Sequence, residues 1–449
     1  MKTKIYSIIC VICMLFSSSF VLSSCDSSDV IGIANAQINE NGELVLIYSD
    51  GNEQNLGVVV GKDGSDGKDG EDGSNGKDGA DGSLVITSDG SSIPAASAKG
   101  LRSAVSIVCN FQATIQQGGW RPGSSSTTTQ DYSSAGSGVI YQMDKAEGDA
   151  FIITNYHVVY DASSNTDNGI SDDISVYLYG SEIEEKAIEA IYVGGSLYYD
   201  IAVLQIDNSD ILKASDACEV DVADSDKIVV GDTAIAIGNA QGYGISTSFG
   251  IVSVDSEYIT MTAADGSTTV SFRVMRTDTA VNSGNSGGGL YNDEGNLIGI
   301  VNAKIVDDGV ENIGYAIPSN VAVSIAENII DYCYGKSEER VQRALLGITV
   351  STSDSKAVYH SETGSFTIEE TVSVYEVTEG SLADGILQAE DVLVSATLNG
   401  EVTEITRQYH IIDMMLDVRV GDVVILNILR SGEEKTVSIT ITEGCLTAY

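Results

Sequence analysis

The sequence predicts a mostly β protein with two β-rich units, and three observations support this fold class. Between residues 101 and 318, short apolar and β-branched runs recur between turns of Gly, Asn, Asp and Ser, which is typical of β-sandwiches and barrels. Residues 345–442 show the same pattern over a shorter length. No helix-length periodic segments alternate with these runs, which argues against a doubly wound α/β sheet.

The length and the charge of the chain narrow the class of protein. A chain of 449 residues is too long for one ordinary core and predicts two or three domains. The formal net charge of −42 argues against nucleic acid as a partner and against docking on anionic lipid, because both need clustered Lys and Arg. The charge instead indicates a solubilising surface.

The first 24 residues indicate an export signal rather than part of the fold. Lys2 and Lys4 precede an apolar run to Leu22, and small residues then lead to Cys25. This resembles the lipobox of bacterial lipoproteins, which implies that Cys25 is lipidated and anchors the chain on the extracytoplasmic face of a bacterial membrane. A plain signal peptide or an uncleaved anchor helix is the alternative. No later run is long and apolar enough to span a bilayer.

Three segments precede the first β-rich unit. Residues 25–60 form a membrane-proximal segment in which Glu43–Tyr48 and Leu56–Val60 predict a small hairpin. Residues 61–82 carry glycine at every third position and resemble bacterial collagen-like segments, but they contain no proline, so a triple helix would be weak. An extended spacer and a trimerising stem are the two interpretations. Residues 83–100 are predicted to be a linker.

We expect neither a metal nor a cofactor. The Asp residues of the glycine repeat lack the spacing of a calcium loop, and the cysteines outside the export signal form no Cys-x-x-Cys pair that would indicate zinc. The sequence leaves open whether the cysteines that follow Cys25 form disulfides or stay as free thiols. These residues are Cys109, Cys218, Cys333 and Cys445.

Three local motifs indicate chemistry. His157 follows an apolar strand-like run, Asp200 begins another, and Ser286 lies in the glycine-rich loop 282–289. A serine hydroxyl is a poor nucleophile until a base takes its proton, and histidine is the natural base near neutral pH. An aspartate can hold the imidazole in the correct tautomer. The glycines let backbone N–H groups turn towards an oxyanion, and we expect the donors to be the amides of Gly284 and Ser286.

Each motif is weak when taken alone, so their order decides between two interpretations. The Gly-Asn-Ser-Gly-Gly segment around Ser286 also fits the nucleophile elbow of α/β hydrolases, which requires the order serine, acid, histidine. The later histidines, His360 and His410, fall in the C-terminal unit. The observed order His157, Asp200, Ser286 is instead that of chymotrypsin.

Further segments at compatible spacing carry a family resemblance. They are Gly136–Ile140, Ile153–Val159, Asp200–Leu204, Ala236–Asn239, Gly250–Ser253, Thr277–Gly288 and Gly314–Pro318. On these motifs, residues 101–335 resemble the chymotrypsin-like serine proteases of the HtrA/Deg family. The resemblance implies a double β-barrel with the triad between the barrels, serine endopeptidase activity and a homotrimer. Ser283 and Gly289 depart from the family pattern, which often has proline at the first position and proline or alanine at the second.

The same resemblance implies a specificity pocket with Ala280 at its base and Lys304 near its wall. Because Ala280 is uncharged, it disfavours a requirement for Lys or Arg before the cut and favours small or aliphatic residues. Beyond this domain, residues 320–334 predict a helix with Ser319 as its N-cap and Gly335 as its stop.

The C-terminal unit, residues 340–445, resembles a PDZ domain. Leu345–Val350 resembles the carboxylate-binding turn and its strand, and residues 405–416 resemble the groove helix. Such domains add a peptide strand to a sheet edge and bind its C-terminus with backbone amides. The amides expected to do so are those of Leu346, Gly347 and Ile348. A small β domain without a peptide-binding role is the alternative.

Two functions follow from these features. The first is a membrane-anchored serine endopeptidase for quality control or processing of unfolded or processed polypeptides, in which the PDZ groove recruits C-terminal peptides or regulates cleavage. The second is a peptide-binding or chaperone-like surface protein with a silent protease fold. The complete triad favours the first.

Overall fold

The computed structural model describes residues 33–41, 43–58, 92–118, 125–181, 184–303, 313–336 and 341–448. The chain divides into two units, Met1–Gly82 and Ser83–Tyr449. Several sequence predictions fall on residues outside the described ranges. These are the export signal, Cys25, the glycine-repeat segment 61–82 and Lys304. No helix in the described part of the chain is long and apolar enough to cross a membrane.

The first unit contains a three-stranded antiparallel sheet in the order β1-β2-β3. The predicted hairpin corresponds to β2 and β3, although β3 begins at Glu53 rather than at Leu56. Strand β1 was not predicted, because its alternating residues are mostly alanine, asparagine and glutamine rather than β-branched or aromatic, and its side chains are all exposed. The three strands are β1 (Ile33–Ile38), β2 (Glu43–Tyr48) and β3 (Glu53–Val58).

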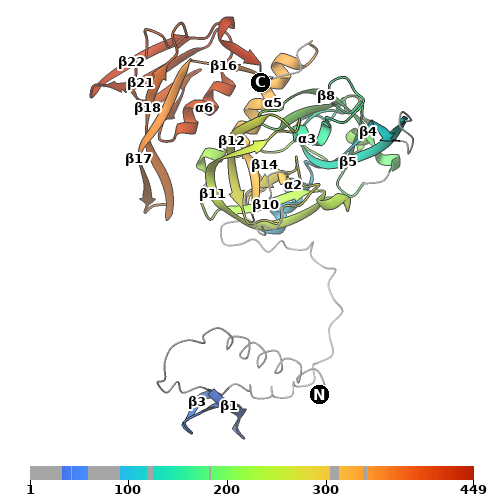
Figure 1. Ribbon diagram of the computed structural model, residues 1–449, viewed down its shortest axis with the longest axis vertical. Coiled ribbons are helices and arrows are strands. Elements are labelled where there is room, and N and C mark those ends of the chain that lie inside the picture. Colours follow the sequence, from blue (N-terminus) through green and yellow to red (C-terminus); the bar gives the residue numbers. More distant parts are fainter. Residues whose placement is uncertain are drawn as a thin grey trace, which may run out of the picture. The chain divides into compact units, whose positions relative to one another are not determined.

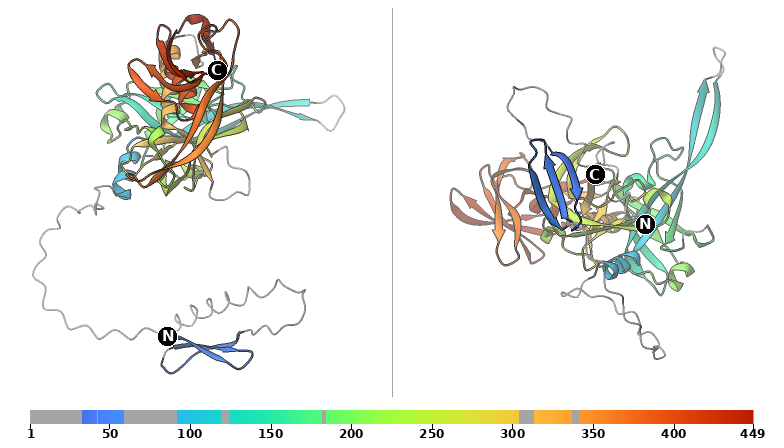
Figure 2. Two further views of the ribbon diagram at one scale, coloured as in Figure 1. Left: turned by 90° about the vertical axis from the view of Figure 1, so that its left-hand side faces the viewer. Right: turned by 90° about the horizontal axis from the view of Figure 1, so that it is seen from below.

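The second unit begins with a closed six-stranded barrel in the order β4-β5-β6-β9-β8-β7. Closure leaves no free strand edge, and the inward-facing Ile107, Ile152 and Leu204 are fully buried. The outer part of the β4–β5 hairpin extends away from the barrel (Figure 2). The strands are β4 (Ala104–Gly118), β5 (Ser125–Asp144), β6 (Asp149–Thr154), β7 (Asp173–Leu178), β8 (Ile188–Ser196) and β9 (Ile201–Ile206).

A second closed barrel follows, in the order β10-β11-β12-β15-β14-β13 (Figure 1). The two closed barrels confirm the prediction of a mostly β chain. Fully or almost fully buried residues such as Ile235, Phe272 and Leu297 fill this second core. The strands are β10 (Thr233–Gly238), β11 (Ser246–Thr262), β12 (Thr269–Thr277), β13 (Gly289–Tyr291), β14 (Leu297–Val301) and β15 (Gly314–Pro318).

Helix α2 (Ile93–Leu101) corrects the prediction that residues 83–100 are a linker throughout. Ser92 caps the helix by accepting a hydrogen bond from the Ala95 N–H at 3.3 Å. Gly100 packs against Ile237 and Tyr291 of the second barrel so closely that a Cβ would not fit. The helix was missed because its contacts are to residues far away in the sequence, and its own apolar pattern is weak.

Helix α5 (Ser319–Cys333) corresponds to the helix predicted over 320–334. The predicted cap is wrong, because Ser319 is the first helical residue and its hydroxyl donates to the Ala223 carbonyl at 2.7 Å. Pro318 occupies the N-cap position. The other short helical segments are α3 (Tyr156–Val159), α4 (Asp210–Ala214), η1 (Glu184–Lys186), η2 (Ser225–Lys227), η3 (Ala240–Gly242) and η5 (Glu443–Cys445).

The C-terminal unit predicted over residues 340–445 is the last part of the second unit. It contains a sheet in the order β17-β18-β19-β21-β22, with β20 paired to β19 and helix α6 packed against the sheet. Strands β16 and β23 form a separate pair where the unit begins and ends. The elements are β16 (Gln342–Ala344), β17 (Ile348–His360), β18 (Ser365–Val377), β19 (Val392–Leu398), β20 (Glu401–Glu404), α6 (Gln408–Asp417), β21 (Val423–Arg430), β22 (Glu433–Thr440) and β23 (Leu446–Ala448).

All of the cysteines in the described part of the chain are free thiols, so no disulfide forms among them. Cys109 and Cys333 are buried, and Cys218 and Cys445 are partly exposed. Burial raises the pKa of the Cys109 thiol to about 12. These cysteines therefore serve as small apolar side chains rather than as cross-links.

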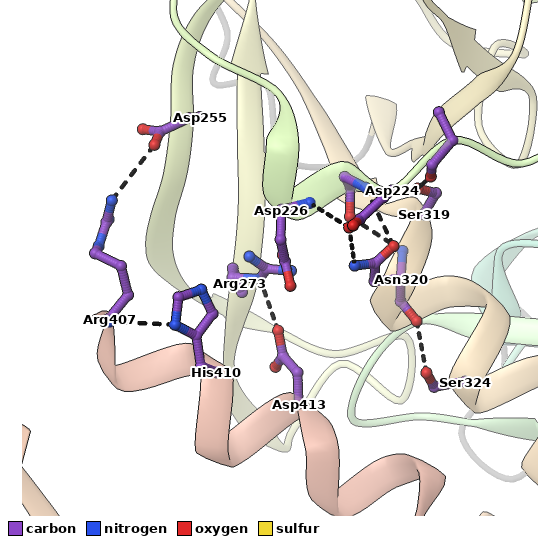
Figure 3. A network of polar contacts seen from close by, with 12 residues as sticks. Asp224, Asp226, Asp255, Arg273, Ser319, Asn320, Ser324, Arg407, His410 and Asp413 are labelled. Atoms are coloured by element: carbon purple, nitrogen blue, oxygen red, sulfur yellow. Dashed lines mark hydrogen bonds and ion pairs between the residues drawn. The ribbon is translucent and has the colours of Figure 1, made fainter. Parts of the chain in front are cut away.

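A buried arginine joins the C-terminal unit to the second barrel (Figure 3). Arg273 of β12 has only 2% of its side chain exposed, and its guanidinium lies 2.9 Å from Asp413 of α6 and 2.9 Å from Asp226. The ring of Tyr409 lies 3.9 Å from the guanidinium carbon. Because an unpaired buried charge is costly, these partners fix where α6 can lie against β12.

Asp413 carries an unusual protonation equilibrium at this interface. Burial raises the pKa of its carboxyl to about 6 from an ordinary value of 3.8. Arg273 and Arg343 oppose this rise, and the nearby carboxylates of Asp226 and Asp417 add to it. The pKa of Asp413 is raised because burial and the negative charge of Asp226 together outweigh the attraction between the Asp413 carboxylate and Arg273.

We expect Asp413→Asn to change how the free energy of unfolding depends on pH. Because the folded-state pKa is raised, the contribution of Asp413 to stability is present below about pH 4 and is lost as the pH rises through about 6. Relative to the variant, the wild type should lose up to about 3 kcal/mol between these limits. Urea unfolding of both proteins across this range measures the difference. A wild type that gains stability relative to the variant as pH rises would contradict the prediction.

Candidate active site

His157 lies on the single helical turn α3 that follows β6. Val158 and Val159 of the same turn are buried and fix it on the first barrel, whereas 19% of the His157 side chain remains exposed. The side-chain amide of Asn155, directly before the turn, donates to the backbone carbonyl of Asp200 at 2.9 Å. The turn is therefore tied to the start of β9, where Asp200 lies.

Asp200 accepts hydrogen bonds on both carboxylate oxygens. Its Oδ1 accepts from the backbone N–H of His157 at 2.9 Å, and its Oδ2 accepts from the ring Nδ1 of His157 at 2.6 Å. Asp200 has a φ of 57°, in the left-handed region that non-glycine residues rarely adopt. A strained backbone of this kind persists only where surrounding bonds hold it, and such strain is frequent at functional sites.

The hydrogen bond to Asp200 determines the tautomer of His157. A carboxylate can only accept, so Nδ1 of the imidazole must carry the donated hydrogen. In the neutral ring, Nε2 is then left as an acceptor, which is the form that a general base requires. The geometry therefore prepares His157 to take a proton at Nε2.

Ser286 lies in the loop between β12 and β13, where two glycines allow the chain to pass close to its neighbours. Gly284 has a φ of 93° and Gly287 has a φ of 84°. A Cβ at Gly284 would collide with the Asn239 carbonyl, and one at Gly287 would collide with the Ser137 carbonyl. The Ser137 N–H donates to the Ser286 carbonyl at 2.8 Å, which joins the loop to β5 of the first barrel.

His157 and Ser286 open on the same cavity, of about 240 Å³. Asp200 lies behind His157, so the structure brings the three predicted residues together from three different loops. Among the described residues, no hydrogen bond joins the Ser286 hydroxyl to the imidazole. Such bonds are often long without substrate and shorten only when substrate is bound. The remaining residues that line the cavity are Ser134, Ala135, Val158, Ser283, Gly284 and Ala303.

Only one of the two predicted specificity residues lies in the described part of the chain. Ala280 is exposed, and its carbonyl accepts from Ser248 Oγ at 3.0 Å and from Asn285 Nδ2 at 3.4 Å. Ala280 is not among the residues that line the cavity of Ser286, and Lys304 lies outside the described residues.

The departure at Gly289 has a local explanation. A Cβ at this position would lie 2.5 Å from the ring of Tyr291, which is fully buried in the second barrel. A residue with a side chain would displace that ring, so Gly289 and Tyr291 are compatible as a pair. The Ser283 carbonyl accepts a hydrogen bond from the Gln241 N–H, which a proline carbonyl could also do, so nothing in the structure explains the departure at Ser283.

Asn302 is a site residue that the sequence reasoning missed. It is fully buried directly after β14, and its Nδ2 donates to Asp200 Oδ2 at 2.8 Å. The same oxygen accepts the hydrogen bond of His157 Nδ1, so Asn302 helps to orient the carboxylate that orients the imidazole. A polar residue at the end of the fully apolar run Leu297–Val301 was the available signal.

The predicted peptide-binding residues lie where β17 begins. The carbonyl of Leu346 accepts from the Ala383 N–H at 3.0 Å, and that of Gly347 accepts from the Thr378 N–H at 2.8 Å. Gly347 has a φ of 80° and packs directly on Ser381. In a planar trans peptide unit the N–H points opposite to the C=O, so the N–H groups of Gly347 and Ile348 point away from this packing.

Comparisons with known proteins agree with this architecture. A family model for a trypsin-like peptidase domain matches residues 136–300. The chain is 34% identical over 364 residues to the serine protease Do-like HtrA of Bacillus subtilis (strain 168), which covers 79% of this chain and 74% of the relative. It is 33% identical over 370 residues to the serine protease Do-like HtrA of Lactococcus lactis subsp. lactis (strain IL1403), which covers 77% and 82%.

A more distant relative is the periplasmic pH-dependent serine endoprotease DegQ of Escherichia coli (strain K12), which is 32% identical over 318 residues and covers 70% of this chain and 60% of the relative. The two barrels and the matched segment define a trypsin-like serine endopeptidase. Identities above 30% over most of the length of these two HtrA relatives then identify the family. The chain belongs to the Do-like HtrA serine proteases.

We expect Asn302→Ala to slow peptide hydrolysis by about 10-fold to 100-fold, mainly through kcat, because the Asp200 carboxylate loses a donor and is oriented less well. Asn302→Ser, which keeps a shorter hydrogen-bond donor, should recover part of the loss. Steady-state kinetics on a peptide substrate, together with thermal melting to confirm folding, measure the effect. A fully active Asn302→Ala variant would show that Asp200 needs no support from the second barrel.

Proposed function

We propose that this chain is a membrane-anchored, extracytoplasmic serine endopeptidase that cleaves unfolded or processed polypeptides, with His157, Asp200 and Ser286 as its catalytic triad. One observation carries the assignment of these residues. Asp200 accepts a 2.6 Å hydrogen bond from His157, and His157 shares a single cavity with Ser286. Membership of the HtrA family supports quality control or processing of surface proteins as the role.

In the proposed reaction, Ser286 Oγ attacks the carbonyl carbon of the scissile bond while His157 Nε2 takes the hydroxyl proton. The backbone N–H groups of Gly284 and Ser286 donate to the oxyanion of the tetrahedral intermediate. His157 then gives its proton to the leaving amine as the C–N bond breaks, which leaves an acyl ester on Ser286. Water, deprotonated by His157, hydrolyses the ester and restores the hydroxyl.

We expect a fluorophosphonate probe to label the wild-type chain and not the Ser286→Ala variant, because phosphonylation needs an activated serine. Ser134→Ala, which removes another hydroxyl from the wall of the same cavity, should keep the labelling. Casein cleavage followed in parallel should fall by at least about 10³-fold only in Ser286→Ala. Casein cleavage that survives Ser286→Ala would exclude the proposed triad.

A second candidate function is a peptide-binding or chaperone-like protein whose protease site is silent. The observation in its favour is the lack, among the described residues, of a hydrogen bond between Ser286 and His157. The labelling experiment separates the two functions. If the wild type is not labelled even when C-terminal peptides are added, the silent-site function takes precedence.

We also propose that residues 340–445 form a PDZ domain that binds C-terminal peptides. Strand β17 is an edge strand of its sheet, and helix α6 packs on the same core. The directions of the Gly347 and Ile348 N–H groups, set by the inward hydrogen bonds of the preceding carbonyls, support carboxylate capture at this edge. Leu346 is buried and anchors the turn.

We expect peptides with a free C-terminal carboxylate to bind at least about 10-fold more tightly than the same peptides with an amidated C-terminus, because the amide loses charge-assisted hydrogen bonds. Gly347→Ala should weaken binding, since a Cβ there collides with Ser381. Gly364→Ala is the matched control, because Gly364 also has a positive φ (71°) but nothing within 4 Å. Fluorescence anisotropy with the Ser286→Ala chain avoids cleavage. Equal affinity for both peptide forms would contradict carboxylate capture.

The extracytoplasmic location and the anchor rest on the N-terminal sequence. The lipobox-like segment that ends at Cys25 supports lipidation. The name of the Escherichia coli relative, which describes that protein as periplasmic, supports export. The family resemblance also supports a homotrimer.

A further inference from the structure

The small sheet β1-β2-β3 of the first unit has one apolar face. Directly paired residues of antiparallel strands point to the same side of a sheet, and alternate residues along one strand share that side. Ile38 of β1 pairs with Leu44 of β2, and Gln54 of β3 pairs with Leu46. The Tyr48 hydroxyl donates to Gln54 Oε1 at 2.6 Å, which places Tyr48 on the same side. The apolar side chains of this face are Ile33, Ile38, Leu44, Leu46, Tyr48 and Leu56.

The apolar face is open, whereas the opposite face covers its own apolar residue. On the opposite face, Val45 pairs with Gln37 on one side and Asn55 on the other, and it is only 8% exposed. On the apolar face, Ile33 and Ile38 of the outer strand β1 are 58% and 46% exposed. The described residues of the first unit contain no element besides these three strands. Nothing among them covers the apolar face.

A sheet of this size needs a partner to be stable. Folded units of fewer than about 40 residues usually require disulfides, a metal or association with other chains, and the three strands lie within residues 33–58. This segment contains no cysteine. The described part of the chain also contains no group of side chains that could hold a metal ion. Association is therefore the route by which this sheet can bury its apolar face.

The sequence around the sheet indicates which partner covers this face. The Gly-X-Y repeat begins at Gly61, soon after β3 ends, and glycine at every third position is the pattern that lets three identical chains pack around one axis. Residues 26–60 contain several Asp and Glu but neither Lys nor Arg, which disfavours the surface of an anionic membrane as the partner. Two further copies of the same sheet fit both observations.

We propose that the apolar face of β1-β2-β3 is an interface between three copies of this chain, whose sheets pack with these faces towards a common axis. Leu46, at the centre of the middle strand, lies nearest this axis, and the face that carries Val45 points to solvent. The interface lies outside the protease and C-terminal units, so it goes beyond the proposed function, and a chain without protease activity forms it equally well.

Cysteine cross-linking of the full chain in detergent tests this interface. Because facing sheets pack about 10 Å apart, a trifunctional maleimide should join Leu46→Cys into covalent trimers at least about fivefold above the wild-type background. The wild type shows this background because Cys218 and Cys445 are partly exposed. Ile47→Cys is the matched control, since Ile47 is the next residue of β2 and lies on the opposite face. It should stay near the background.

Ile38→Cys, at the exposed edge of the apolar face, repeats the test in case Leu46→Cys disturbs the sheet. Covalent trimers from either variant, with Ile47→Cys at the background, would support the proposal. Equal cross-linking from both faces would overturn it, because a trimer held only by the protease domains brings the sheets close without aligning these faces. Dimers without trimers, or no cross-linking above the background, would overturn it as well.

A second measurement distinguishes a membrane from other copies of the chain. An environment-sensitive fluorophore attached to Leu46→Cys should report an apolar environment in detergent and show no further shift in vesicles of phosphatidylethanolamine and phosphatidylglycerol. A shift that appears only with the vesicles would mean that the membrane covers this face, and it would overturn the proposal. Fluorophosphonate labelling of Ser286 is unaffected by any of these outcomes, so a failure here leaves the proposed function standing.

Discussion

The candidate site depends on one buried carboxylate that both barrels share. Asp200 accepts from His157 of the first barrel and from Asn302 at the end of a strand of the second. A buried carboxylate without partners costs several kcal/mol, so the two barrels must meet in the arrangement that supplies these donors. The strained backbone of Asp200 is tolerated for the same reason. The turn of His157 and the end of strand β14 are both held at the carboxylate of Asp200.

The chemistry-bearing motifs were predictable because they are local. An apolar strand that ends at His157, one that begins at Asp200 and a glycine-rich loop around Ser286 are visible in the sequence itself, and their order selects the fold. Asn302 was harder to predict, because it acts through Asp200, a partner far away in the chain. A polar residue after an apolar strand is a weak signal, since its residue type alone indicates nothing about catalysis.

The interface of the C-terminal unit was unpredictable for a related reason. Arg273, Asp226 and Asp413 are separated by long stretches of sequence, and in a chain this acidic any single Asp is expected at the surface. An apolar contact accompanies the charged one, since Leu416 of α6 packs with the core of the second barrel. The apolar part supplies burial, whereas the buried charges require one particular alignment of α6 and β12.

The free cysteines determine how the chain responds to its redox surroundings. Neither barrel is closed by a covalent bond, and the buried Cys109 thiol stays protonated, so it reacts poorly with oxidants. Folding therefore waits for no oxidase or disulfide isomerase, and reducing agents find no cross-link to open in the described part of the chain. The described fold is therefore held together by packing, hydrogen bonds and ion pairs alone, and its stability does not depend on a redox partner.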